Sequence, residues 1–140
     1  MLSNRSIPRA TVIPVLAYPD VHQAAAWLCD AFGFTVRLRI GDHRVQLNVG
    51  DGAVIVRELR ENEKGGALGE GHSLTIRVED ADVHCQRARE HGAKITQDPV
   101  TQMYGERQYN AEDLVGHVWT FSQSMADVDP KDWGGTPEQL

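Results

Sequence analysis

The side chains in this chain that are best suited to chemistry are polar and aromatic residues that alternate with apolar ones. They can hold a drug-sized organic molecule by stacking and a few hydrogen bonds. In short strands, alternation would place them together on one face of a sheet. The predicted ligand-binding residues are Arg37, Arg39, Gln46, Ser73, Thr75, Tyr104, Arg107, Tyr109 and Thr120, with Arg77 in the same phase as Thr75. Taken singly, each arginine is also typical of a solvated surface and each tyrosine of a core or rim.

The sequence contains no recognisable phosphate loop, Ser-His-Asp set or pair of catalytic carboxylates. His117 has no carboxylate at a fixed spacing to orient it, so we expect a turn or strand-end role. Cys29 and Cys85 fall in predicted helices and read as small packing residues. His84 adjoins Cys85, but neighbouring helical residues point about 100° apart and do not form a dyad. These patterns favour binding over catalysis.

Composition narrows the possible partners. The 140 residues carry a net charge of -6, and the 14 Lys and Arg residues are scattered, so we expect no nucleic acid partner. An acidic surface suits a cationic small molecule but is also ordinary for a cytoplasmic protein. No apolar run approaches the roughly 18 residues of a membrane span, and the first ten residues lack a secretion signal. We therefore expect a cytoplasmic protein with no membrane partner.

The elements that position these side chains come in two copies. Val21, Ala25 and Leu28 form a helical stripe, and an equivalent stripe recurs sixty residues later in Ala81, Cys85 and Ala88. The stripes predict helices over 21–31 and 81–91, each entered from an apolar run and followed by a glycine. So narrow an apolar stripe must pack on a sheet. The sheet face left uncovered, between the two copies, is the expected ligand cleft.

Alternating apolar residues predict the strands of each copy. Pro14 cannot donate a ladder hydrogen bond, so the first strand should lie at a sheet edge. A polar, glycine-rich stretch over 60–72 reads as a linker. We predict one domain over 10–124, with half-modules at about 10–60 and 70–124, and a tail over 125–140 in which Trp133 docks on the body or on a partner. The predicted strands are 12–17, 36–40, 45–49, 53–58, 74–78, 93–96, 105–111 and 117–122, with a loop around Asp98-Pro99.

Two stretches of the chain resemble the vicinal oxygen chelate superfamily, which includes glyoxalases, extradiol dioxygenases and bleomycin resistance proteins. They are VLAYPDVHQAAAWLCDAFGF (15–34) and YGERQYNAEDLVGHVWTF (104–121), and they look most like the PhnB-like and bleomycin-resistance-like branch. The resemblance covers roughly 10–122. It implies an α+β fold in which tandem βαβββ modules form a curved mixed sheet cleft backed by helices.

Enzymes of that superfamily hold a divalent metal through His or Glu on the first and last strands of each half. Counting along the sequence places those positions at Ile13, Val56, Ser73 and Thr120, none of which is a good metal ligand. A register shift would bring in Glu58, His72 or Glu106 as alternative ligands. A shift of two residues keeps Glu58 on the same face, whereas His72 would need a bulge.

The lack of good metal ligands at these four positions favours a non-catalytic protein without a cofactor. By its resemblance, it would be a homodimer that sequesters a small organic molecule, an antibiotic or a related metabolite. The alternative is a metal-dependent lyase, isomerase or dioxygenase of the glyoxalase type. A third possibility is an interaction module without a small ligand.

Overall fold

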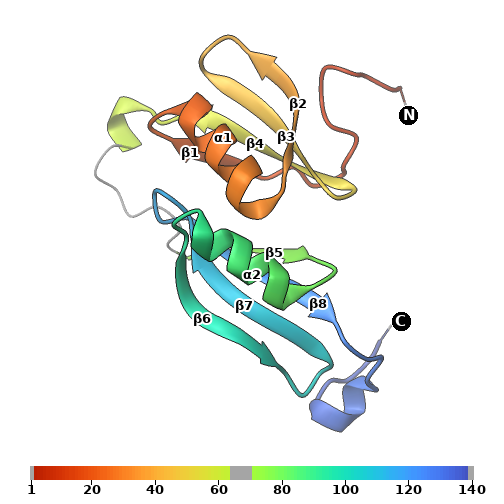
Figure 1. Ribbon diagram of the computed structural model, residues 1–140. Coiled ribbons are helices and arrows are strands. Elements are labelled where there is room, and N and C mark those ends of the chain that lie inside the picture. Colours follow the sequence, from red (N-terminus) through yellow and green to blue (C-terminus); the bar gives the residue numbers. More distant parts are fainter. Residues whose placement is uncertain (1, 64–70, 139–140) are drawn as a thin grey trace. The chain divides into compact units, whose positions relative to one another are not determined.

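The computed structural model describes residues 2–63 and 71–138 (Figure 1). The chain forms two compact units, residues 1–68 and 69–140, and each contains one βαβββ module. In the described part of the chain, no helix is both long and apolar enough to cross a membrane.

The first unit builds a four-stranded sheet with one helix packed on it. The strand order is β1-β4-β3-β2, with β1 parallel to β4 and the other pairs antiparallel. The edge position of β1, which begins one residue after Pro14, confirms the prediction. The elements are β1 (Val15–Tyr18), α1 (Val21–Phe32), β2 (Thr35–Ile40), β3 (Arg44–Val49), β4 (Gly52–Glu58) and a short 3-10 helix, η1 (Glu61–Glu63).

Helix α1 begins at Val21, as predicted, and ends at Phe32, one residue beyond the predicted end. The Asp20 carboxylate accepts a hydrogen bond from the Gln23 N–H, and Gly33 ends the helix in the left-handed conformation. The predicted stripe of α1 is buried against β3 and β4. In the sheet, the residues on this face are at most 1% exposed: Val45, Leu47, Val54 and Val56. The helix therefore covers one face of the first sheet.

The second unit repeats this arrangement. Its strand order is β5-β8-β7-β6, with β5 parallel to β8. Helix α2 begins at the Asp80 cap, whose carboxylate accepts from the Val83 N–H. The elements are β5 (Leu74–Arg77), α2 (Ala81–Glu90), β6 (Lys94–Thr101), β7 (Glu106–Glu112), β8 (Val118–Ser124) and a short 3-10 helix in the tail, η2 (Pro130–Trp133).

Aromatic residues fill the space between α2 and the second sheet. Trp119 and Phe121 are fully buried, and their rings stack in parallel with centroids 6.3 Å apart. Tyr109 lies beside Phe121, at 5.1 Å between ring centroids. This aromatic layer fixes which residues of β7 and β8 face the helix and which face away from it.

A buried carboxylate organises the turn between β7 and β8. Asp113 Oδ1 accepts hydrogen bonds from the backbone N–H groups of Val115 and His117, and Oδ2 accepts from Trp119 Nε1, all at 3.1 Å. His117 is buried directly before β8, which confirms its strand-end role. The GHVWTF motif (116–121) therefore contributes to a turn held by hydrogen bonds to Asp113 and supplies a tryptophan to the core.

Strand β6 and the tail differ from the sequence prediction. Strand β6 continues through Pro99, where a loop was predicted, because irregularities in its pairing with β7 accommodate the proline. The tail contains η2, where no regular element was expected. Residues 64–70 of the predicted linker lie outside the described residues.

Candidate functional site

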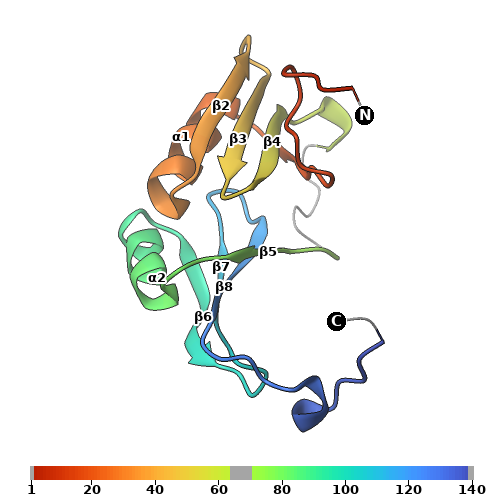
Figure 2. The same cartoon turned by 90° about the vertical axis from the view of Figure 1, so that its right-hand side faces the viewer.

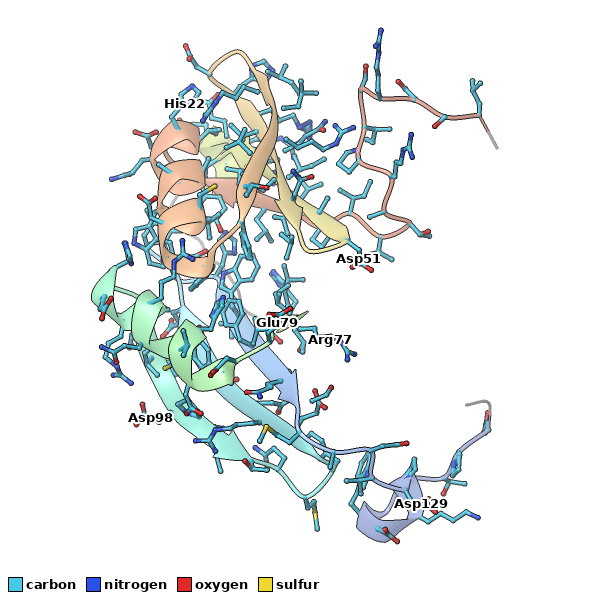
Figure 3. All side chains as sticks on the ribbon, turned by 45° about the vertical axis from the view of Figure 1, so that its right-hand side comes forward. His22, Asp51, Arg77, Glu79, Asp98 and Asp129 are labelled. Carbon is cyan, nitrogen blue, oxygen red and sulfur yellow. The ribbon has the colours of Figure 1, made fainter. Side chains whose placement is uncertain are left out.

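Each sheet has one face under its helix and an opposite face that we call its open face. On the second sheet, the register places side chains of β5, β7 and β8 on the open face, and they are almost all polar. Arg77 extends from β5 on the side away from α2 (Figure 3). From these three strands, the second open face comprises Thr75, Arg77, Glu106, Gln108, Asn110, Glu112, Val118, Thr120, Ser122 and Ser124.

Hydrogen bonds connect these side chains across the strands. The Tyr104 hydroxyl donates to Gln108 Oε1 (2.7 Å), and Gln108 Nε2 donates to Ser122 Oγ (3.0 Å). Thr120 Oγ1 donates to Asn110 Oδ1 at 2.8 Å. The amides and hydroxyls are thus held in fixed orientations, as ligand-binding groups must be to fix a ligand's orientation.

Glu106 joins this network at the end of the face where β7 begins and β8 ends. Ser122 Oγ donates to Glu106 Oε1 at 2.7 Å. This hydrogen bond lowers the pKa of Glu106, with further lowering from Ser124 and the Arg77 charge and an opposing contribution from burial. Glu106 therefore carries a negative charge at neutral pH.

A cleft of about 520 Å³ lies at this end of the second open face. It is lined by Tyr104, Glu106, Ser124 and residues 125–128, which lead into the tail. The Trp133 ring lies against Tyr104, at 5.3 Å between ring centroids, so the docking of Trp133 on the body is confirmed. The size of the cleft falls within the range of small-molecule sites.

Four of the predicted binding residues lie on or beside the second open face. Thr75 and Thr120 are adjacent in the β5–β8 register, and Tyr104 lines the cleft. Ser73 is exposed and directly precedes β5 in the phase of Thr75. The sequence reasoning missed Gln108, Asn110 and Ser122. Knowledge of the pairing between β7 and β8 would have identified them. Tyr109 pairs with Phe121 and so faces the helix, which leaves Gln108 and Asn110 on the open face.

The predicted placement of Arg107 and Tyr109 on the open face is wrong. Both lie on the helix side of β7, because they share the phase of Phe121. Arg107 makes two hydrogen bonds to the Asp82 carboxylate on α2, at 2.9 and 3.0 Å. The Tyr109 hydroxyl is hydrogen-bonded to His84 Nδ1, and burial raises the pKa of this tyrosine. These two residues tie the sheet to the helix.

The N-terminal segment runs along the side of the first sheet away from α1 (Figure 2). Arg37 and Gln46 lie on this first open face, bonded to each other and to the backbone of that segment. Arg37 Nη2 donates to the Arg5 carbonyl and Gln46 Nε2 to the Ser6 carbonyl, both at 2.9 Å. Gln46 is only 3% exposed as a result. The predicted ligand contacts of these two side chains are therefore occupied by the chain itself.

Arg39 is also misplaced by the prediction. A register shift in β2 between Val36 and Leu38 interrupts the alternation, so Arg39 pairs with Val45 on the helix side. There its guanidinium lies 3.4 Å from His22 Nδ1 on α1. A single extra residue in a strand thus moves every later side chain to the other face.

The proposed metal positions do not fit a resident metal ion. Val56 is fully buried beneath α1, and Glu58 has the same phase on β4. His72 lies near His117 before β8, whereas Glu106 pairs with Ser124 at the far end of that strand, roughly 20 Å away. Within residues 2–63 and 71–138, no three His, Cys, Asp or Glu side chains gather as a metal site would require.

The comparisons with known proteins agree with this architecture. TioX from Micromonospora sp. ML1 is 33% identical, with 86% of this chain and 100% of TioX covered and a TM-score of 0.68. A glyoxalase/bleomycin resistance protein/dioxygenase family enzyme from Burkholderia phytofirmans PsJN shares the fold at 17% identity, with 80% of this chain and 96% of that chain covered and a TM-score of 0.69. No curated protein matches the chain. Residues 10–121 match the sequence model of the glyoxalase/bleomycin resistance protein/dioxygenase superfamily, and the chain therefore belongs to this superfamily.

Proposed function

We propose that this protein binds a small organic molecule on the second open face and releases it unchanged. The observation that carries the proposal is the hydrogen-bonded set of amides and hydroxyls beside an aromatic-walled cleft of about 520 Å³. Oriented polar groups on a largely preformed surface give a ligand its specificity. A binding role also accounts for the poor fit of the proposed metal positions.

The ligand class follows from the family and the surface together. The superfamily includes bleomycin resistance proteins, so we propose an antibiotic or a related metabolite, held without covalent chemistry. The amides of Gln108 and Asn110 offer donors and acceptors, and the Tyr104 ring offers a stacking surface. We further propose that the protein acts as a homodimer, which rests on the family resemblance alone.

The proposal is tested by nuclear magnetic resonance titration of the full chain with a panel of aromatic antibiotics that includes metal-free bleomycin. We expect saturable shifts of the amide signals of Gln108, Asn110 and Thr120. Thr120→Val should weaken binding, because it removes the hydroxyl bonded to Asn110. Thr11→Val makes the same chemical change at an exposed position in the other unit and serves as the control. Chemical conversion of the bound compound, detected by mass spectrometry, would contradict a purely binding role.

A further inference from the structure

We infer that the cleft beside Tyr104 receives a protonated amine of the ligand, with Glu106 as its counter-ion and the C-terminal segment as one wall. This inference rests on the proposed function and names the chemical class of the group that the second open face selects. It concerns a part of the site that lies partly beyond Phe121, where the match to the family model ends.

The Glu106 carboxylate is prepared to receive a cation. Ser122, which is 4% exposed, donates to Glu106 Oε1 at 2.7 Å and itself accepts from Gln108 Nε2 at 3.0 Å. The sheet thus fixes one oxygen of the carboxylate, and the residue lines the cleft. A charged acceptor in a fixed position forms shorter and stronger hydrogen bonds with an ammonium group than neutral acceptors do.

Two residues with charged side chains line the cleft, Glu106 and Asp127, and both are acidic. The nearest basic side chain on this face is Arg77, whose Nη1 donates to Ser124 Oγ at 3.2 Å. Arg77 lowers the pKa of Glu106 but is not among the residues lining the cleft. The lining therefore carries two negative charges and no positive one, which favours a cation over a carboxylate.

The C-terminal segment is held in place as a wall of the cleft. The Gly105 carbonyl accepts from the N–H groups of Met125 (2.8 Å) and Ala126 (3.3 Å). Gly105 has φ of 89°, and a Cβ at this position would lie 2.6 Å from the Ala126 carbonyl oxygen. Only glycine allows this close approach. The half-buried Tyr104 ring adds an aromatic wall that can stack on a ligand or contact its cation.

The experiment uses three small probes of matched size: 2-phenylethylamine, 2-phenylethanol and 3-phenylpropionate. Each is titrated into the full chain, and amide signals are followed by nuclear magnetic resonance. We expect the amine to bind more tightly than the alcohol and to shift the signals of Tyr104, Glu106 and residues 125–128. Glu106→Gln should weaken amine binding by roughly three- to tenfold while leaving alcohol binding unchanged. Glu90→Gln removes the same charge on the exposed side of α2 and should have no effect.

A second variant separates a loss of the amine site from a loss of the fold. Gly105→Ala should displace residues 125–128 and weaken amine binding, while the core signals of Trp119 stay unchanged. Equal affinity for the amine and the alcohol, or amine binding that Glu106→Gln leaves intact, would overturn the inference. If the probes shift only the amide signals of Asn110 and Thr120, and bind equally whatever their charge, the inference is wrong and the proposed binding function still stands. If none of the three probes binds, the inference fails, and the antibiotic panel alone decides the proposed function.

Discussion

Asp113 satisfies three N–H groups at once, so its replacement by alanine should strongly destabilise the second unit. The carboxylate accepts from the backbone of Val115 and His117 and from the indole of Trp119. Val115 is half-buried and its N–H can reach water, whereas His117 and Trp119 are 4% and 0% exposed. Each buried donor left unsatisfied costs about 1–3 kcal/mol. Two such donors lower the free energy of unfolding by about 4 kcal/mol, a large part of the roughly 5–15 kcal/mol that a domain has.

Urea unfolding, followed by the resonances of the second unit, measures this loss. Asp98→Ala in the same unit is the control, because Asp98 is 77% exposed and its ion pair with Arg89 should contribute less than about 1 kcal/mol. Trp119→Phe in the Asp113→Ala background tests the mechanism. Once the acceptor is gone, removal of the indole N–H should cost less than it does in the wild-type protein. A loss for Asp113→Ala no larger than that of the control would refute the reasoning.

Two further predictions concern the first unit. Deletion of residues 2–9 should lower its free energy of unfolding by about 1–3 kcal/mol, since two hydrogen bonds to Arg37 and Gln46 are lost, and the Gln46 side-chain amide should exchange faster with solvent. An unchanged exchange rate would show that the segment does not cover Gln46 in solution. The hydrogen bond from Arg57 and a backbone N–H lower the pKa of Glu63 to about 2. Because this pKa is lower in the folded than in the unfolded chain, the stabilisation is present above about pH 5 and is lost as the pH falls towards 2. Glu63→Gln should therefore make the melting temperature less sensitive to acidification between pH 5 and 3, and an identical decrease in both proteins would contradict this.

The sequence predicts the helices well because their signals are local. The predicted stripes are buried, and Asp20 and Asp80, directly before them, cap the two helices. Within each helix, one apolar stripe and one cap fix both the start and the buried face. The fold class follows from the repetition of this pattern with alternating strands.

The face of the sheet on which each strand residue lies is harder to predict from the sequence, because it depends on the pairing between strands. The register shift near Arg37 in β2 has no signature in the alternating sequence, and it sends Arg39 to the helix side. Tyr109 was misplaced for a different reason. Both alternating sets of residues in its strand, ERQYNAE (106–112), contain polar side chains, so the sequence does not show which set is buried. Only the pairing of Tyr109 with Phe121 decides this.

The two modules share one topology, but their open faces differ in a way that favours the second as the binding surface. On the first, the backbone of the N-terminal segment covers Arg37 and Gln46, so a ligand there would have to displace that segment. On the second, Glu106 faces a cleft that the C-terminal segment walls without filling. In each module a terminal segment thus sets what its open face can bind. Under the proposed function, segments outside the repeated fold, rather than the fold itself, therefore select the face on which a ligand is held.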